Sequence, residues 1–257
     1  MSIEYKNSDY VLRIGDDAPK TLAVVNRYEA FLEALTTADF EHVREGVRKA
    51  IHFFVTEKYA NTEQAAIATF NGSEKLKNRY RDLKEYLGYV RIKDKKSYSI
   101  DLATGTGKSW VIYGVAQIML AEGLVDKVLV LCPSLTIEEE LKKKFEQFSG
   151  NAILTKILEE LEAQYPSPAI KSANDPILNG DICVENIHAA YQRTGSSIED
   201  SFKGKGQRAL VISDEAHHIY SEADASLKKW FDFITDEAYG FQYLLGLSGT
   251  PYIGDEY

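Results

Sequence analysis

The chain has 257 residues, which is enough for one large α/β domain with a smaller appendage. Its 44% hydrophobic and 27% charged residues are typical of a globular protein. Its apolar runs are only as long as a strand, and its first residues lack the apolar core of a signal peptide. We therefore expect a cytoplasmic protein with no membrane partner. The net charge of −9 argues against tight, non-specific nucleic-acid binding by the chain as a whole, but it leaves room for a local basic track on an acidic body.

Residues 1–90 are predicted to form a helical N-terminal region. Apolar residues recur at helical spacing in four segments, 27–35, 40–59, 62–70 and 74–87. In the second segment, Val43, Val47 and Ile51 would lie on one face of a helix. We expect such faces to form core rather than to contact a cofactor.

From residue 97 onward, predicted strands alternate with helices. The strands are 97–102, 127–132, 181–184, 209–213 and 243–248, and the helices are 109–121, 137–148 and 225–233, with a weak helix between 150 and 179 and a helix or turn at 186–191. This alternation predicts an α/β fold with a mostly parallel sheet that is covered by helices on both faces. Cys132 and Cys183 fall within such strands without metal-ligand spacing, so we expect two small core residues.

The sequence LATGTGKS at 102–109 lies between a predicted strand and a predicted helix. Gly105 and Gly107 would let backbone N–H groups turn around phosphates, Lys108 would reach the phosphate oxygens, and Ser109 would offer a hydroxyl to Mg²⁺. Thr104 and Thr106 belong to the same expected phosphate loop. Leu102 stands where the strict pattern has a small residue, but the strand–loop–helix context favours a nucleotide site.

A second motif, LVISDEAHH at 210–218, is an apolar strand that ends in two carboxylates. We expect Asp214 to hold Mg²⁺ and Glu215 to position and deprotonate the attacking water. His217 is interpreted as a polar link near the nucleotide and His218 as structural, because adjacent histidines on a helix are poorly placed to chelate one metal. A third strand, 245–251, ends in the small hydroxyl residues Ser248 and Thr250.

The segments ATGTGKS (103–109), DEAH (214–217) and SGTP (248–251) resemble, in order and spacing, motifs I, II and III of superfamily 2 helicases of the DEAH-box type. VLVLCPS (128–134) looks like motif Ia, and residues 184–188 occupy the place of motif Ib. The overall sequence pattern is most similar to that of the ATPase subunits of type III and type I restriction enzymes and related bacterial or phage helicases. The resemblance implies that residues 91–257 form a first RecA-like P-loop domain, which binds ATP and Mg²⁺ and moves along nucleic acid, DNA rather than RNA.

The same resemblance implies roles for individual residues. Asp214, Glu215, Lys108 and His217 would be catalytic. Ser248 and Thr250 would couple the nucleotide state to movement of the nucleic acid. The backbone of the nucleic acid would lie near Pro133, Ser134 and Asn186.

Two departures from the family pattern are expected to matter. The adenine-reading glutamine is not obvious upstream of residue 102, and Gln64 is the best candidate. The second RecA-like domain, with its arginine finger, would follow Tyr257 in the same parent chain, so we expect residues 1–257 alone to bind nucleotide weakly and to hydrolyse it barely. Partner subunits are possible in this family.

Two alternatives to a DNA helicase or translocase stay open. The motifs do not read bases, so an RNA helicase would carry the same residues. A non-catalytic, nucleotide-dependent interaction module is the third reading, and the intact Lys108, Ser109 and carboxylate pair argue against it.

Overall fold

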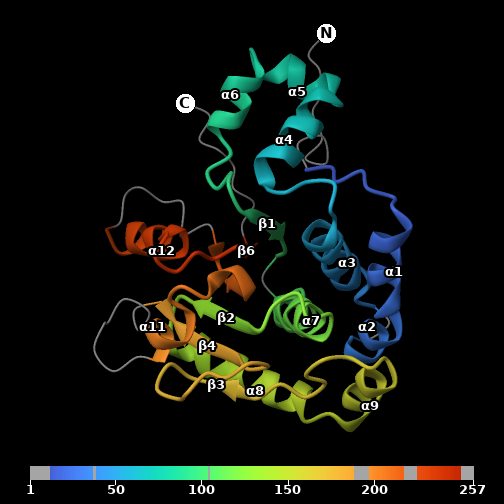
Figure 1. The fold of residues 1–257 in the computed structure, drawn as a ribbon, viewed down its shortest axis with the longest axis vertical. Helices are drawn as coiled ribbons and strands as arrows, with labels where there is room; N and C mark the ends of the chain where they lie inside the picture. Colours follow the sequence, from blue (N-terminus) through green and yellow to red (C-terminus); the bar gives the residue numbers. More distant parts are fainter. Residues whose placement is uncertain (1–11, 37–38, 104, 188–196, 217–224, 250–257) are drawn as a thin grey trace.

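The computed structural model describes residues 12–36, 39–103, 105–187, 197–216 and 225–249 (Figure 1). Its centre is a six-stranded sheet in which every pair of neighbouring strands is parallel, in the order β1-β6-β5-β2-β4-β3. The strands are β1 Lys96–Asp101, β2 Lys127–Cys132, β3 Ile170–Lys171, β4 Ile182–Asn186, β5 Ala209–Ser213 and β6 Tyr243–Ser248. The predicted α/β fold is confirmed.

The central strands are buried on both faces because their sequences are continuously apolar. In β2, Val128, Val130 and Cys132 face one hydrophobic cluster, whereas Leu129 and Leu131 face a second cluster on the other side of the sheet. This arrangement is typical of parallel sheets that are sandwiched between helices. Cys132 and Cys183 are fully buried and have free thiols, so the prediction that both are core residues is confirmed.

The helices cover the two faces unequally. The described helices are α1 Pro19–Arg27, α2 Glu29–Leu35, α3 Glu41–Val55, α4 Thr62–Asn71, α5 Glu74–Arg79, α6 Leu83–Gly88, α7 Lys108–Ala121, α8 Leu135–Ser149, α9 Ala152–Glu160, α11 Ser197–Phe202 and α12 Ala225–Thr235. Residues of α2, α3, α7, α8 and α9 form the first cluster with the sheet, and residues of α11 and α12 belong to the second. None of the helices in the described part of the chain is long and apolar enough to cross a membrane.

Several predicted boundaries are corrected. The predicted helix at 74–87 is two helices, because the Asp82 side chain accepts a hydrogen bond from the Glu85 amide at 2.8 Å and starts α6 anew. The segment 27–35 is likewise the end of α1 followed by α2, with Tyr28 between them. Asn186 is the last residue of β4 rather than the first of a helix. The short β3 and α11 were not predicted.

The N-terminal helices α2 and α3 pack directly on α7. A Cβ atom added to Gly114 of α7 would lie 3.2 Å from Val47 and 3.5 Å from Leu35. The absence of a side chain at Gly114 therefore permits the close approach of these helices. The N-terminal residues thus help to position the helix that follows the phosphate loop, while the division of the chain near residue 90 stays a prediction.

Candidate nucleotide-binding site

The phosphate loop connects the carboxyl end of β1 to the amino end of α7. Gly105 and Gly107 both have left-handed backbones, with φ angles of 80° and 102°. Such angles are strained for residues that carry a Cβ, and they let successive amides of the loop turn inward. The loop is tightened further by Thr106, whose hydroxyl donates to the Ala103 carbonyl at 2.6 Å.

The amino end of α7 is suited to an anion. Among the residues that the structure describes, no side chain caps this helix, whose first residues are Lys108 and Ser109. Free N–H groups and the helix dipole both favour negative charge at such an end. A magnesium–triphosphate ligand requires an ammonium, a hydroxyl and carboxylates as partners. Lys108, Ser109 and the acid pair Asp214 and Glu215 offer these groups.

The sheet brings the acid pair to this loop. The Lys108 ammonium forms an ion pair with the Glu215 carboxylate and lies 3.7 Å from Oδ1 of Asp214. The Asp214 amide donates to the Leu131 carbonyl at 2.9 Å, which holds the end of β5 against the end of β2. Residues that are 106 and 107 positions apart in the sequence therefore meet at the carboxyl edge of the sheet, as predicted for a parallel fold.

Burial makes the charge of Asp214 costly. Its side chain is only 9% exposed, and this desolvation raises the pKa of Asp214, although the Lys108 ammonium opposes the rise. A divalent cation at the carboxylate would favour its ionised form in the same way as Lys108. This electrostatic setting fits the magnesium role that was expected for Asp214.

Glu215 is held in an unusual backbone conformation. Its φ angle is 55°, which is uncommon for a residue with a side chain. Its carboxylate also accepts a hydrogen bond from the Gly249 amide at 3.3 Å, just beyond β6. The carboxylate thus contacts both Lys108 and the segment that contains the third motif.

Ser248 lies beside the phosphate loop as well. It is buried, it pairs with Asp101 in the sheet register, and its carbonyl accepts a hydrogen bond from the Leu102 amide at 2.8 Å. The third motif and the phosphate loop are therefore joined through the backbone. The expected coupling residue Thr250, the loop residue Thr104 and His217 lie outside the described residues.

The sequence did not reveal that His42 contacts the phosphate loop. Nε2 of His42 lies 2.9 Å from the Thr106 carbonyl, and Phe40 packs edge-on against Trp110 of α7 with ring centroids 4.5 Å apart. A carbonyl can only accept, so Nε2 must carry the proton. The only signal in the sequence was that Phe40 and His42 lie at the start of a strongly amphipathic helix, α3.

Replacing His42 with Ala is expected to raise KM for ATP about twofold to tenfold, the size of one net hydrogen bond of about 0.5–1.5 kcal/mol, and to leave kcat nearly unchanged. The reason is that the loop would lose an anchor without losing a charged group. Steady-state ATPase kinetics of the protein that carries both motor domains check this result, and His42→Gln, which keeps a donor, should recover part of the loss. A fall in kcat with constant KM would contradict a positioning role.

Gln64, the predicted adenine contact, has a hydrogen-bond partner at the start of its own helix. It lies in the first turn of α4, where its side-chain oxygen accepts from the Ala60 amide at 2.9 Å. The neighbouring Thr62 donates to the carbonyls of Lys95 and Ser97 at the amino end of β1, whereas the phosphate loop follows the carboxyl end. The adenine contact of Gln64 therefore stays a prediction, made for a side chain on α4 near the amino end of β1.

The three residues expected near nucleic acid lie at the ends of β2 and β4, but in different environments. Pro133 and Ser134 are half-buried, and the Ser134 hydroxyl caps α8 by accepting from the Ile137 amide at 3.4 Å. Asn186 is only 7% exposed, and its amide donates to Glu138 at 2.8 Å and to Glu185 at 2.9 Å. The side chain of Asn186 thus takes part in a buried hydrogen-bond network, and its contact with nucleic acid stays a prediction.

Comparison with known proteins gives the family. The sequence profile described as "Type III restriction enzyme, res subunit" matches residues 60–253, which is well over half of the chain. The chain belongs to this family. The res-subunit region, a helicase-like ATPase domain, contains the phosphate loop, the acid pair and the third motif, whereas α1–α3 and His42 precede it.

Solved structures similar to this chain come from bacteriophage T4 and Sulfolobus solfataricus. The UvsW helicase of bacteriophage T4 is 15% identical, with a TM-score of 0.40 over 65% of this chain and 51% of that chain. The Sulfolobus solfataricus SWI2/SNF2 ATPase core in complex with dsDNA is 16% identical, with a TM-score of 0.42 over 77% of this chain and 34% of that chain. This chain thus spans about half or less of the length of either structure. No curated protein matches it.

Proposed function

We propose that this chain is the ATP-binding motor domain of an ATP-dependent DNA helicase or translocase of the DEAH-box type, acting in a restriction or defence system. The observation that carries the proposal is the meeting of Lys108, Asp214 and Glu215 at the amino end of α7. Three charged groups at one helix end, beside a loop with two left-handed glycines, are what phosphoryl transfer from a nucleoside triphosphate requires.

Each residue has a distinct part in the proposed reaction. Lys108 binds phosphate oxygens, and Ser109 and Asp214 would hold a magnesium ion, which would supply charge neutralisation at the phosphates. Glu215 orients a water molecule and accepts its proton. In the structure the Lys108 ammonium is paired with Glu215, so binding of a triphosphate would exchange one anionic partner of Lys108 for another and release the Glu215 carboxylate.

Movement along DNA is proposed to need a second RecA-like domain of the same parent protein, which closes over the nucleotide and supplies an arginine finger. Such a finger contributes about 10³–10⁵-fold to turnover. Ser248, which is joined through its backbone to the start of the phosphate loop, is the proposed link between nucleotide state and strand movement, together with Thr250 and His217.

The direct test is Lys108→Ala. ATP affinity is expected to fall about 10- to 100-fold, since one charged hydrogen-bond partner contributes about 1.5–3 kcal/mol. Binding of a fluorescent ATP analogue to residues 1–257 measures this, with Lys156→Ala as control because Lys156 lies on α9 with a side chain that is 75% exposed. Equal affinity of Lys108→Ala and the parent chain would contradict the proposal.

Two alternatives differ in their outcome. An RNA helicase would show ATPase stimulation by poly(U) above that by poly(dT) in the protein that carries both motor domains. A non-catalytic interaction module would bind ATP through Lys108 yet be indifferent to the loss of the Glu215 carboxylate. The intact donor set around Lys108 favours the catalytic function.

A further inference from the structure

A small basic lobe lies at residues 74–96, which include α5, α6 and the segment that leads into β1. This basic lobe contains nine lysines and arginines and four acidic residues, a net charge of +5 in a chain whose total is −9. The remainder of the chain therefore carries −14. Positive charge that is gathered on one part of an acidic protein indicates a polyanionic partner for that part.

The basic lobe lies apart from the nucleotide site. It follows α4, whose Thr62 amide and hydroxyl donate to the Lys95 carbonyl at 2.9 and 2.8 Å. This contact is at the amino end of β1, and Figure 1 shows α4–α6 together beyond β1, on the side of that strand away from α7. Any ligand of the basic lobe would be separate from the nucleotide and from the ends of β2 and β4.

Aromatic side chains accompany the charges. Tyr80, Tyr86 and Tyr89 form a continuous group, with ring centroids 5.3 Å apart between the first two and 5.4 Å between Tyr80 and Tyr89. Phe70 of α4 stacks on Tyr86 at 5.4 Å and anchors the group. Tyr89, at the end of the group, is 69% exposed, the highest value among the large hydrophobic side chains of the described residues. An exposed ring that is supported from behind offers a flat surface on which a nucleobase can stack.

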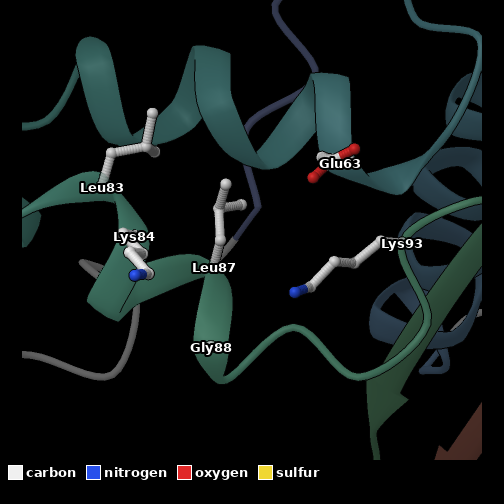
Figure 2. A pocket seen from close by; sticks show the side chains of 6 residues that line it. All are labelled: Glu63, Leu83, Lys84, Leu87, Gly88 and Lys93. Carbon is white, nitrogen blue, oxygen red and sulfur yellow. The ribbon is translucent and has the colours of Figure 1, made fainter.

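An open pocket lies next to this group. Its volume is about 590 Å³, and α6 supplies an apolar wall through Leu83 and Leu87. Figure 2 shows the Lys93 side chain extending toward Leu87, with Lys84 on α6 and Glu63 on α4 also at the pocket. Apolar surface flanked by two ammonium groups suits a flat aromatic ring that is attached to a phosphate, and the volume is within the range of small-ligand sites, about 300–1,000 Å³.

We propose that the basic lobe is a second nucleic-acid surface, and that it binds single-stranded DNA through stacking on Tyr89 and phosphate contacts with Lys77, Arg81 and Lys84. The inference rests on the proposed function for the choice of DNA over other polyanions. A single strand is favoured over a duplex because an exposed tyrosine such as Tyr89 can stack on an unpaired base, whereas paired bases present only their edges and backbone.

The first experiment reverses three charges. Lys77→Glu/Arg81→Glu/Lys84→Glu is compared with Lys20→Glu/Lys49→Glu/Lys156→Glu, whose target side chains are exposed on α1, α3 and α9. Both variants change the total charge equally. Distant charges are screened within about 10 Å at 0.1 M salt, so only the first variant should lose affinity.

Binding of labelled oligo(dT) to residues 1–257 is measured by fluorescence anisotropy across a series of salt concentrations. The lobe variant should bind at least about tenfold more weakly, and the slope of log affinity against log salt should become shallower by about 2, which is three contacts at roughly 0.7 each. Equal losses in the two triple variants, or an unchanged slope, would overturn the proposal.

The second experiment tests stacking. Tyr89→Ala should weaken oligo(dT) binding about fivefold or more, the range for one stacked base, while Leu178→Ala, at a site of 65% exposure away from the lobe, should not. A duplex that binds as tightly as the single strand and is insensitive to Tyr89→Ala would contradict the single-strand assignment. Tighter binding of oligo(U) than of oligo(dT) would contradict the choice of DNA.

The two proposals can fail separately. If the lobe variants bind oligo(dT) normally while Lys108→Ala loses ATP binding, this inference alone fails. If Lys108→Ala keeps ATP binding while the lobe variants lose DNA binding, the proposed function fails instead.

Discussion

Glu215→Gln should lower ATP hydrolysis about 10²–10⁴-fold, the contribution of a positioned general base, while ATP still binds. The amide keeps the shape of the side chain and can accept the hydrogen bond from the Gly249 amide, but it cannot take a proton from water. Hydrolysis is measured in the protein with both motor domains and saturating DNA, and binding is measured on residues 1–257. Because the glutamine side chain is neutral, it should attract the Lys108 ammonium less strongly and leave the lysine free to bind phosphate.

The backbone at Glu215 makes this residue a strong candidate for the base. A non-glycine residue with φ of 55° costs of order 1–3 kcal/mol, and such strain tends to be retained at functional sites. Glu237→Gln, at an exposed position after α12, is the matched control. Hydrolysis that is unchanged in Glu215→Gln would show that the acid pair is not catalytic and would favour the interaction-module alternative.

Gly107→Ala is expected to have the largest structural effect of any single change in the phosphate loop. The new Cβ would lie 2.8 Å from a ring carbon of Trp110 and 2.9 Å from a methyl carbon of Val43, at a φ of 102° that disfavours any side chain. Backbone strain of about 1–2 kcal/mol and overpacking of about 1–3 kcal/mol should together lower the melting temperature by about 4–20 °C at roughly 2–4 °C per kcal/mol. Nucleotide binding should be lost with the loop geometry.

Gly105→Ala provides the control for this prediction. Gly105 also has a positive φ, of 80°, but nothing lies within 4 Å of its hypothetical Cβ. It should therefore suffer only the backbone cost of about 1–2 kcal/mol. Thermal denaturation of the two variants, with and without ATP, separates the steric term from the backbone term. Identical melting temperatures would mean that the Trp110 and Val43 side chains move aside at little cost in free energy, and that α3 packs only weakly against the loop.

The site could be predicted from the sequence because its chemistry is encoded locally. Gly105, Gly107 and Lys108 belong to one short segment, and Asp214 and Glu215 end one apolar strand. Parallel strands bring their carboxyl ends to one edge of a sheet, so the two segments had to meet once the alternation of strands and helices was recognised. The ion pair between Lys108 and Glu215 is the observed form of that expectation.

For two other predicted site residues the structure shows contacts that the sequence did not reveal. Gln64, the predicted adenine contact, accepts a hydrogen bond from the Ala60 amide in the first turn of α4, near the amino end of β1. Asn186, predicted to lie near nucleic acid, donates its side-chain amide to two carboxylates. Burial also raises the pKa of the Glu185 carboxyl, with the nearby Glu138 contributing. Side-chain partners of this kind depend on packing between distant elements, which periodicity does not encode.

The sequence by itself determined the α/β fold, the strands of the centre of the sheet and the residues that meet at the phosphate loop, because each follows from short-range apolar patterns and glycine spacing. Only the tertiary structure decided that His42, 64 residues before Thr106, contacts the loop, and that residues 74–96 gather their charges and tyrosines at the opposite end of β1. Both arrangements depend on which face of one helix meets another, and that choice is made by shape complementarity of the whole core.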